Sequence, residues 1–294
     1  MSLGRERIAV AAFVAEAVLA GGNAVGVRFS NRELDPFWGA ALRFALAAGL
    51  LAAVMVAMKL TLPRGRALLG ALLYGILIFG AAFGLAYYAL VRVHARLGQT
   101  LLALVPLATL LLAVAHRQER LRPAAILGAL LALSGIAVIS GVSDREPLPL
   151  LSLLAVLGAV LCFAEGTVLA RHFPAVHPVT LNAVGMTAGA ATLLVVSLVW
   201  GEAIVLPEKA ATWLAVGYLV VVGSGVVFVL YAVVIRLWSA SRAAYTFVLT
   251  PVVTVLLSAW LDDEPISAGL VLGGVMVLAG VYVGALRPGA PSPG

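Results

Sequence analysis

Long apolar runs dominate the chain, and short polar segments separate them. Each run holds about 20 residues, enough for an α-helix to cross a hydrocarbon core of roughly 30 Å. The connections are short and rich in proline, which leaves no room for a soluble domain between the runs. The pattern predicts ten membrane-spanning helices, at residues 8–28, 36–58, 67–91, 97–115, 122–141, 148–170, 178–200, 210–235, 242–261 and 266–286.

The composition supports an integral membrane protein. Hydrophobic residues make up 63% of the 294 residues, charged residues 11%, and the mean hydropathy is +1.11. A soluble or disordered chain of this length does not carry so much apolar surface. A single cysteine, Cys162, excludes a disulfide scaffold. The formal charge of +6 comes from basic residues spread between the apolar runs, without the basic face that binds nucleic acid.

The basic residues also predict how the helices are oriented. With ten spans, twelve of the 19 Lys and Arg fall on the side of the N-terminus and six on the opposite side, while Arg43 lies within a span. Basic residues accumulate on the cytoplasmic face of a membrane. We therefore expect a multi-pass protein of the bacterial inner membrane with both termini in the cytoplasm.

The two halves of the chain repeat one pattern. Residues 101–135 align with residues 246–280 at an offset of 145, and the alignment superposes Pro106 on Pro251, Glu119 on Glu264, Gly128 on Gly273 and Gly135 on Gly280. With small drifts in offset, it also superposes Arg28 on Arg171, Pro36 on Pro178, Tyr87 on Tyr231 and Arg92 on Arg236. The alignment predicts two five-helix domains, residues 1–146 and 147–294.

An odd number of helices per domain makes the two domains inverted repeats. Two similar halves that face opposite ways have two packings of nearly equal free energy, one open inward and one open outward. The predicted fold is therefore an all-α membrane bundle of ten helices in two inverted repeats, suited to transport by alternating access.

The sequence resembles the drug/metabolite transporter superfamily over residues 8–287. The residues that carry the resemblance are Pro36, Arg43 and Phe44 in the second span, together with the repeated Pro, Glu, Gly, Gly pattern. Within the superfamily the chain is most similar to ten-helix EamA-type exporters of the bacterial aromatic amino-acid type. The resemblance implies a central cavity lined by the first four helices of each half. The second half has Gly185 and Met186 in place of the Arg-Phe pair, so symmetry does not duplicate any role of Arg43.

Three ionisable residues lie within apolar spans, where a charge is costly unless it faces protein or water. Glu16 and Asn23 are two helical turns apart and mark one polar stripe of the first helix, with Glu16 nearer the cytoplasmic side. Arg43 lies nearer the outer side. Glu16 is a candidate for an ammonium or a proton, and Arg43 for a carboxylate. A structural charge network is the alternative for both residues. Glu165 is expected to reach water or to pair with Arg171.

Further candidates for substrate contact are polar or aromatic. Gln99 and Asn182 offer amides that either meet a zwitterion or join two helices. Aromatic rings recur every four positions in the third span and have counterparts in the second half, so we expect a central aromatic cavity, with core packing as the alternative. The aromatic candidates are Tyr74, Phe79, Phe83, Tyr87, Phe163, Tyr231 and Tyr245, with Phe228 and Phe247 nearby.

Two prolines and several absent motifs complete the prediction. Pro106 and Pro251 are expected to remove mid-helix hydrogen bonds at symmetric positions and so to act as hinges. There is no Walker A motif, no HExxH and no cluster of metal-ligand spacing, so the chain is predicted to be no enzyme and to use neither cofactor nor metal.

These observations predict a secondary transporter that exports aromatic and other hydrophobic amino acids. Its expected partners are a small-molecule substrate and membrane lipid, with the chain as a monomer. Efflux of lipophilic cations, which needs Glu16 but not Arg43, is the first alternative. A membrane receptor that transports nothing is the second.

Overall fold

A computed structural model describes residues 3–90, 102–140, 150–261 and 268–286, and within these ranges all regular structure is helical. The elements, in which η marks a π-helical segment, are α1 (Leu3–Gly21), α2 (Asn23–Ser30), α3 (Pro36–Ala57), α4 (Arg66–Gly75), η1 (Ile76–Ala82), α5 (Phe83–Leu90), α7 (Val105–Ala115), α8 (Pro123–Ser140), α9 (Leu150–His172), α10 (Pro178–Trp200), α11 (Ala210–Tyr218), η2 (Leu219–Val226), α12 (Val227–Leu237), α13 (Ala240–Ala243), α14 (Thr246–Leu261), α15 (Ala268–Val281) and η3 (Tyr282–Leu286).

Five continuous helical stretches are long and apolar enough to cross a membrane. They are Pro36–Ala57, Arg66–Ala89, Leu150–His172, Pro178–Trp200 and Ala210–Leu237. Shorter apolar helices cover Val105–Ala115, Pro123–Val138 and Val271–Ala285. The ends of the five long stretches agree with the predicted spans to within a few residues. The prediction of an all-helical chain with several apolar spans is therefore confirmed for the described residues.

The structure interrupts several spans that the sequence predicts as continuous. A turn at Gly22 separates α1 from α2. The third and eighth spans each contain a π-helical segment near their middle, and these segments begin 143 residues apart, at Ile76 and Leu219. A π-helical segment shifts the backbone register and is frequent at functional sites. Apolar periodicity does not report such a shift, because a π segment leaves the span apolar.

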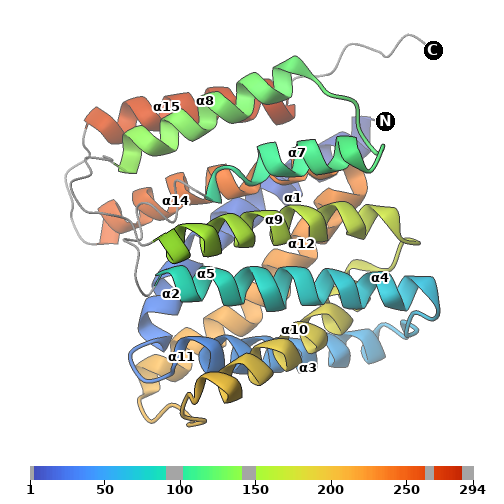
Figure 1. Cartoon of the computed structure of the whole chain (residues 1–294), viewed down its shortest axis with the longest axis vertical. Helices are drawn as coiled ribbons and strands as arrows, with labels where there is room; N and C mark the ends of the chain where they lie inside the picture. Colours follow the sequence, from blue (N-terminus) through green and yellow to red (C-terminus); the bar gives the residue numbers. More distant parts are fainter. Residues whose placement is uncertain (1–2, 91–101, 141–149, 262–267, 287–294) are drawn as a thin grey trace.

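Two helix pairs form the edges of the bundle, and the remaining long helices lie between them (Figure 1). At one edge α3 packs along α10, and at the other α8 packs along α15. Glycines bring the second pair close together: a Cβ atom added to Gly128 would lie 2.7 Å from the carbonyl oxygen of Gly280. Small residues at such positions let two membrane helices approach closely.

The two ends of the bundle differ in their connections. The start of α1 and the loops 58–65, 116–122 and 173–177 lie at one end, called here the N-terminal end (Figure 1). The loops 31–35 and 201–209 lie at the opposite end and are joined by carboxylates. Asp35 accepts a hydrogen bond from the Ala203 amide at 3.0 Å, and Glu33 accepts one from the Lys209 amide at 3.2 Å. A hydrogen bond from the Thr212 side chain, helped by Lys209, holds the pKa of the Glu33 carboxyl below its usual value.

Glu202 caps α3 from across this end of the bundle. Its carboxylate accepts hydrogen bonds from the amides of Phe37, at 3.1 Å, and Trp38, at 2.7 Å. These amides belong to the first turn of α3, where the helix itself supplies no acceptor. Glu202→Ala should therefore lower the free energy of unfolding by about 1–2 kcal/mol, measured by denaturation in detergent. The matched control is Glu208→Ala, which removes an exposed charge from the same loop; equal losses in both variants would contradict the capping role.

Candidate functional site

Glu16 lies in α1 with only 3% of its surface exposed. Its Oε2 accepts a hydrogen bond from the Thr246 hydroxyl at 2.6 Å, so the contact joins α1 to α14 in the other half of the chain. Among the described residues, no Lys, Arg or His forms an ion pair with it. The carboxyl group thus sits in the protein interior, where the Thr246 hydroxyl contacts one of its oxygens.

Two tyrosines lie within electrostatic range of Glu16. The Tyr231 hydroxyl shares a hydrogen bond with Thr167 at 2.8 Å, and the Tyr74 hydroxyl donates to the Asn182 side chain at 3.5 Å. The Asn182 amide nitrogen donates to the carbonyl of Phe228 at 2.9 Å and to that of Pro178 at 2.9 Å. In this structure, therefore, Asn182 joins helices, the second of the two roles foreseen for it.

Arg43 lies in α3 and is 2% exposed. Its Nε donates to the Ser224 hydroxyl at 2.7 Å, and its Nη2 donates to the Gly223 carbonyl at 2.9 Å. Both partners belong to the π-helical segment η2. Tyr87 is a further hydrogen-bond partner, and the guanidinium lies 5.7 Å from the centre of the Phe83 ring. In the part of the chain that the structure describes, no carboxylate pairs with this buried cation.

Asn23 lies beside Arg43, directly after the turn that separates α1 from α2. Its Nδ2 donates to the Gly223 carbonyl at 3.3 Å, while its Oδ1 is buried without a hydrogen-bond partner. A buried acceptor without a donor costs free energy, so a ligand that donates a hydrogen bond would be favoured there. The absence of a side chain at Gly223 makes the close approach possible, because an added Cβ atom would meet both Asn23 and Arg43.

An aromatic cluster from both halves of the chain connects the surroundings of Arg43 with those of Glu16. Ring centres lie 4.9 Å apart for Phe44 and Phe83 and 5.7 Å apart for Phe83 and Phe163. The cluster continues through Phe247, 4.7 Å from Phe163, to Tyr231 at 6.0 Å. Other members are Tyr74, Phe79, Tyr87 and Phe228. The rings pack against one another, which is the core-packing alternative for this conformation.

Other predicted residues lie elsewhere. The Tyr245 hydroxyl donates to the Ala125 carbonyl at 2.7 Å, which places it against α8. Gln99 lies outside the described residues. The expectation of a mid-helix proline is wrong for Pro106, which lies in the first turn of α7, where no helix hydrogen bond is lost. Pro251 does lie inside α14.

Glu165 has a partner different from the one expected. Its Oε1 lies 3.0 Å from His116 Nε2, at the end of α7. Arg171, with which it was expected to pair, instead donates a hydrogen bond to the carbonyl of Trp238. The pair with His116 holds α9 against α7, which agrees with a structural role.

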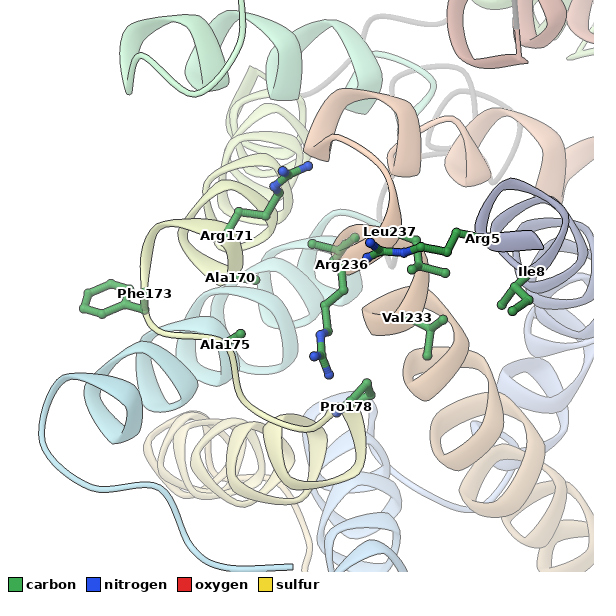
Figure 2. Close-up of a pocket in the computed structure, with 11 residues that line it drawn as sticks. Arg5, Ile8, Ala170, Arg171, Phe173, Ala175, Pro178, Val233, Arg236 and Leu237 are labelled. Atoms are coloured by element: carbon green, nitrogen blue, oxygen red, sulfur yellow. The ribbon is translucent and has the colours of Figure 1, made fainter. Parts of the chain in front are cut away.

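A cavity of about 530 Å³ opens at the N-terminal end of the bundle. Figure 2 shows three arginines that reach it from three helices: Arg5 from α1, Arg171 from α9 and Arg236 from α12. The sequence pattern does not distinguish these residues as a site, because basic residues at this end also serve as orientation signals. A signal was present in the repeat, which aligns Arg171 and Arg236 with Arg28 and Arg92.

The sequence is similar to known transporters over most of its length. The model of the EamA-like transporter family matches residues 7–141 and again residues 150–285. An uncharacterized inner membrane transporter of Escherichia coli K12, YedA, is 27% identical over 270 residues, covering 89% of this chain and 88% of the relative. The uncharacterized transporter YyaM of Bacillus subtilis 168 is 28% identical over 267 residues, covering 86% of each chain.

A solved crystal structure shares the fold. It superposes with a TM-score of 0.81 at 21% sequence identity and covers 95% of this chain and 96% of its own. At this identity the likeness concerns the fold alone.

Proposed function

Because the chain belongs to the EamA-like transporter family, we propose that it is a secondary transporter that exports amino acids, foremost hydrophobic and aromatic ones, across the cytoplasmic membrane. Uncharacterized inner membrane transporters among its relatives support the location. Both termini would then lie in the cytoplasm, so the N-terminal end of the bundle would be its cytoplasmic end. No enzymatic step is part of the proposal.

The observation that carries the proposed substrate is the placement of one acid and one base around an aromatic cluster. Arg43, buried without a carboxylate, would bind the substrate carboxylate by charge-assisted hydrogen bonds. Glu16 would accept the ammonium group or a coupled proton, and the Asn23 Oδ1 atom would accept a further hydrogen bond. The rings between these groups suit an apolar side chain.

Alternating access would arise from two inverted five-helix domains, residues 1–146 and 147–294, with ten helices in all. The two matches of the family model support a repeat. Helix contacts support it as well: α1 packs on α12 and α14, and α9, its counterpart, packs on α5 and α7. The paired π-helical segments η1 and η2 occupy matching positions. Exchange of conformation between the domains would expose the central site to each side in turn.

Pro251 would act as a hinge in this exchange, because it leaves a carbonyl of α14 without its helix hydrogen bond. Pro251→Ala should restore that bond and lower the maximal transport rate roughly threefold to tenfold without lowering thermal stability. Pro106→Ala is the matched control and should change the rate little, since Pro106 lies in a first helical turn. Unchanged transport in Pro251→Ala would remove the hinge from the mechanism.

Efflux of lipophilic cations is the alternative that a specific observation favours. A buried carboxylate such as Glu16, next to an aromatic cluster, also suits a cation. A buried arginine in the same core opposes that ligand, which is why we favour a substrate with both charges.

Transport by the purified protein in liposomes tests the proposal. Labelled phenylalanine, threonine and a lipophilic cation are offered separately, with and without an imposed pH gradient. Uptake of the amino acids above that of empty liposomes is expected, and the effect of the gradient reports proton coupling. Movement of the cation alone would support multidrug efflux, and no movement at all would support a receptor.

A further inference from the structure

The cavity at the N-terminal end is positively charged and has apolar walls. Three of the eleven residues that line it are arginines, and the other eight are apolar. Ile8, Val233 and Leu237 are among the apolar ones. A cavity with cationic and apolar walls, but no acid, suits a ligand that combines an anionic group with an apolar body.

The described acidic residues at the same end of the bundle do not form ion pairs with these arginines. Arg5 and Arg236 have no ion pair or hydrogen-bond acceptor among the described residues. Arg171 has one fixed contact, with the Trp238 carbonyl, which orients its side chain at the rim.

The acids themselves are engaged elsewhere. Glu6 pairs with Arg242 at 2.8 Å, and Glu165 pairs with His116 at 3.0 Å. Glu119 accepts hydrogen bonds from the amide and hydroxyl of Ser241 at 3.0 and 2.5 Å. A cluster of like charges repels itself, and an anion placed among the guanidinium groups would relieve that repulsion.

The repeat supplies an independent argument. Orientation in the membrane requires arginines on the cytoplasmic side only. In the sequence, Arg171 nevertheless aligns with Arg28 of α2, which the predicted topology puts on the outer side, and Arg236 aligns with Arg92, which lies outside the described residues. Arginines that recur at matching sequence positions of an inverted repeat fit a role in the transport path, since symmetric access needs a matching entrance on each side.

We propose that this cavity is the cytoplasmic entrance of the transport path and that Arg5, Arg171 and Arg236 attract the carboxylate of the substrate before it reaches the central site. The inference rests on the proposed function and narrows it. A positive entrance raises the local concentration of carboxylates and lowers that of lipophilic cations. The amino-acid substrate would approach with its carboxylate toward the arginines, its apolar side chain against Ile8 and Val233, and its ammonium group in water.

The test measures the electrostatic potential of the cavity without relying on transport. In a Cys162→Ser background, Val233→Cys places a thiol in the cavity wall, and Ile8→Cys provides a second position if the first variant does not fold. The rates of modification by an anionic and by a cationic methanethiosulfonate of similar size are compared with their rates on a small free thiol. Relative to the free thiol, the anionic reagent should modify the cysteine roughly tenfold faster than the cationic one. This preference should disappear in the double variant Arg5→Gln/Arg236→Gln and at about 0.5 M salt.

Two further arms identify the ligand. Phenylalanine should slow the modification, whereas phenylalaninamide, which lacks the carboxylate, should not. The matched control, Arg66→Gln, removes an exposed arginine from the same end and should leave the reagent ratio unchanged.

Any one of three results would contradict the proposal that the cavity is an entrance. They are a reagent ratio equal to that of the free thiol, equal protection by both phenylalanine compounds, and protection by phosphatidylglycerol vesicles but not by phenylalanine, which would make the cavity a lipid site. Failure of the proposed function would appear separately, as absent phenylalanine transport by the unmodified protein.

Discussion

Arg43→Gln is expected to lower phenylalanine transport at least about 100-fold. The variant removes the buried positive charge that would bind the substrate carboxylate, and a charge-assisted hydrogen bond in such a site contributes roughly 3 kcal/mol. The glutamine side chain is shorter and neutral but still donates hydrogen bonds toward Ser224 and Gly223, the present partners of Arg43. Initial rates in proteoliposomes measure the effect.

Controls separate substrate binding from folding in this variant. Thermal denaturation in detergent should show a change that is small compared with the loss of transport. Arg43→Lys retains the charge without the planar fork of donors and should recover only part of the rate. A variant that loses phenylalanine transport in proportion to its loss of folded protein would make Arg43 a structural residue.

Glu16→Gln is expected to lower phenylalanine transport roughly tenfold to 100-fold and to abolish its response to an imposed pH gradient. Glutamine accepts the Thr246 hydrogen bond through its carbonyl oxygen, so the contact between α1 and α14 persists while the charge and the exchangeable proton are lost. Initial rates with and without the gradient report the two effects separately.

Glu165→Gln provides the matched control for this second variant. Glu165 is also a glutamate of the bundle, but it is partly exposed and pairs with His116. The control should retain the rate and the gradient response of the wild type. Unchanged transport by Glu16→Gln at every pH would remove Glu16 from the mechanism.

The sequence was a good guide to where helices lie and a poor guide to their irregularities. Apolar runs predicted the positions of α3, α9 and α10 to within two residues, because the length of a span follows from the thickness of the membrane. The turn at Gly22 and the π-helical segments depend on tertiary contacts. One such contact is the hydrogen bond from the Tyr218 hydroxyl to the Leu19 carbonyl at 2.8 Å, beside the turn.

The sequence also predicted part of the candidate site, because the spacing of residues shows which side chains share one face of a helix. Spacing by four residues put Phe79, Phe83 and Tyr87 on one face, and these rings do join the aromatic cluster. Spacing does not say which neighbour a face meets, and Tyr245 was therefore assigned to the centre although it contacts α8. The π segment that offers Gly223 and Ser224 to Arg43 also left no trace in the apolar pattern.

The central claim is that the substrate carries both a carboxylate and an ammonium group. Counterflow tests it most directly: proteoliposomes loaded with unlabelled phenylalanine exchange it for labelled phenylalanine, and phenylalaninamide or 3-phenylpropionate is added outside as a competitor. We predict that phenylalanine competes at least ten times better than either analogue, since each analogue lacks one charge. Competition by phenylalaninamide equal to that of phenylalanine would contradict the claim, because a site that needs only the cation has no use for Arg43.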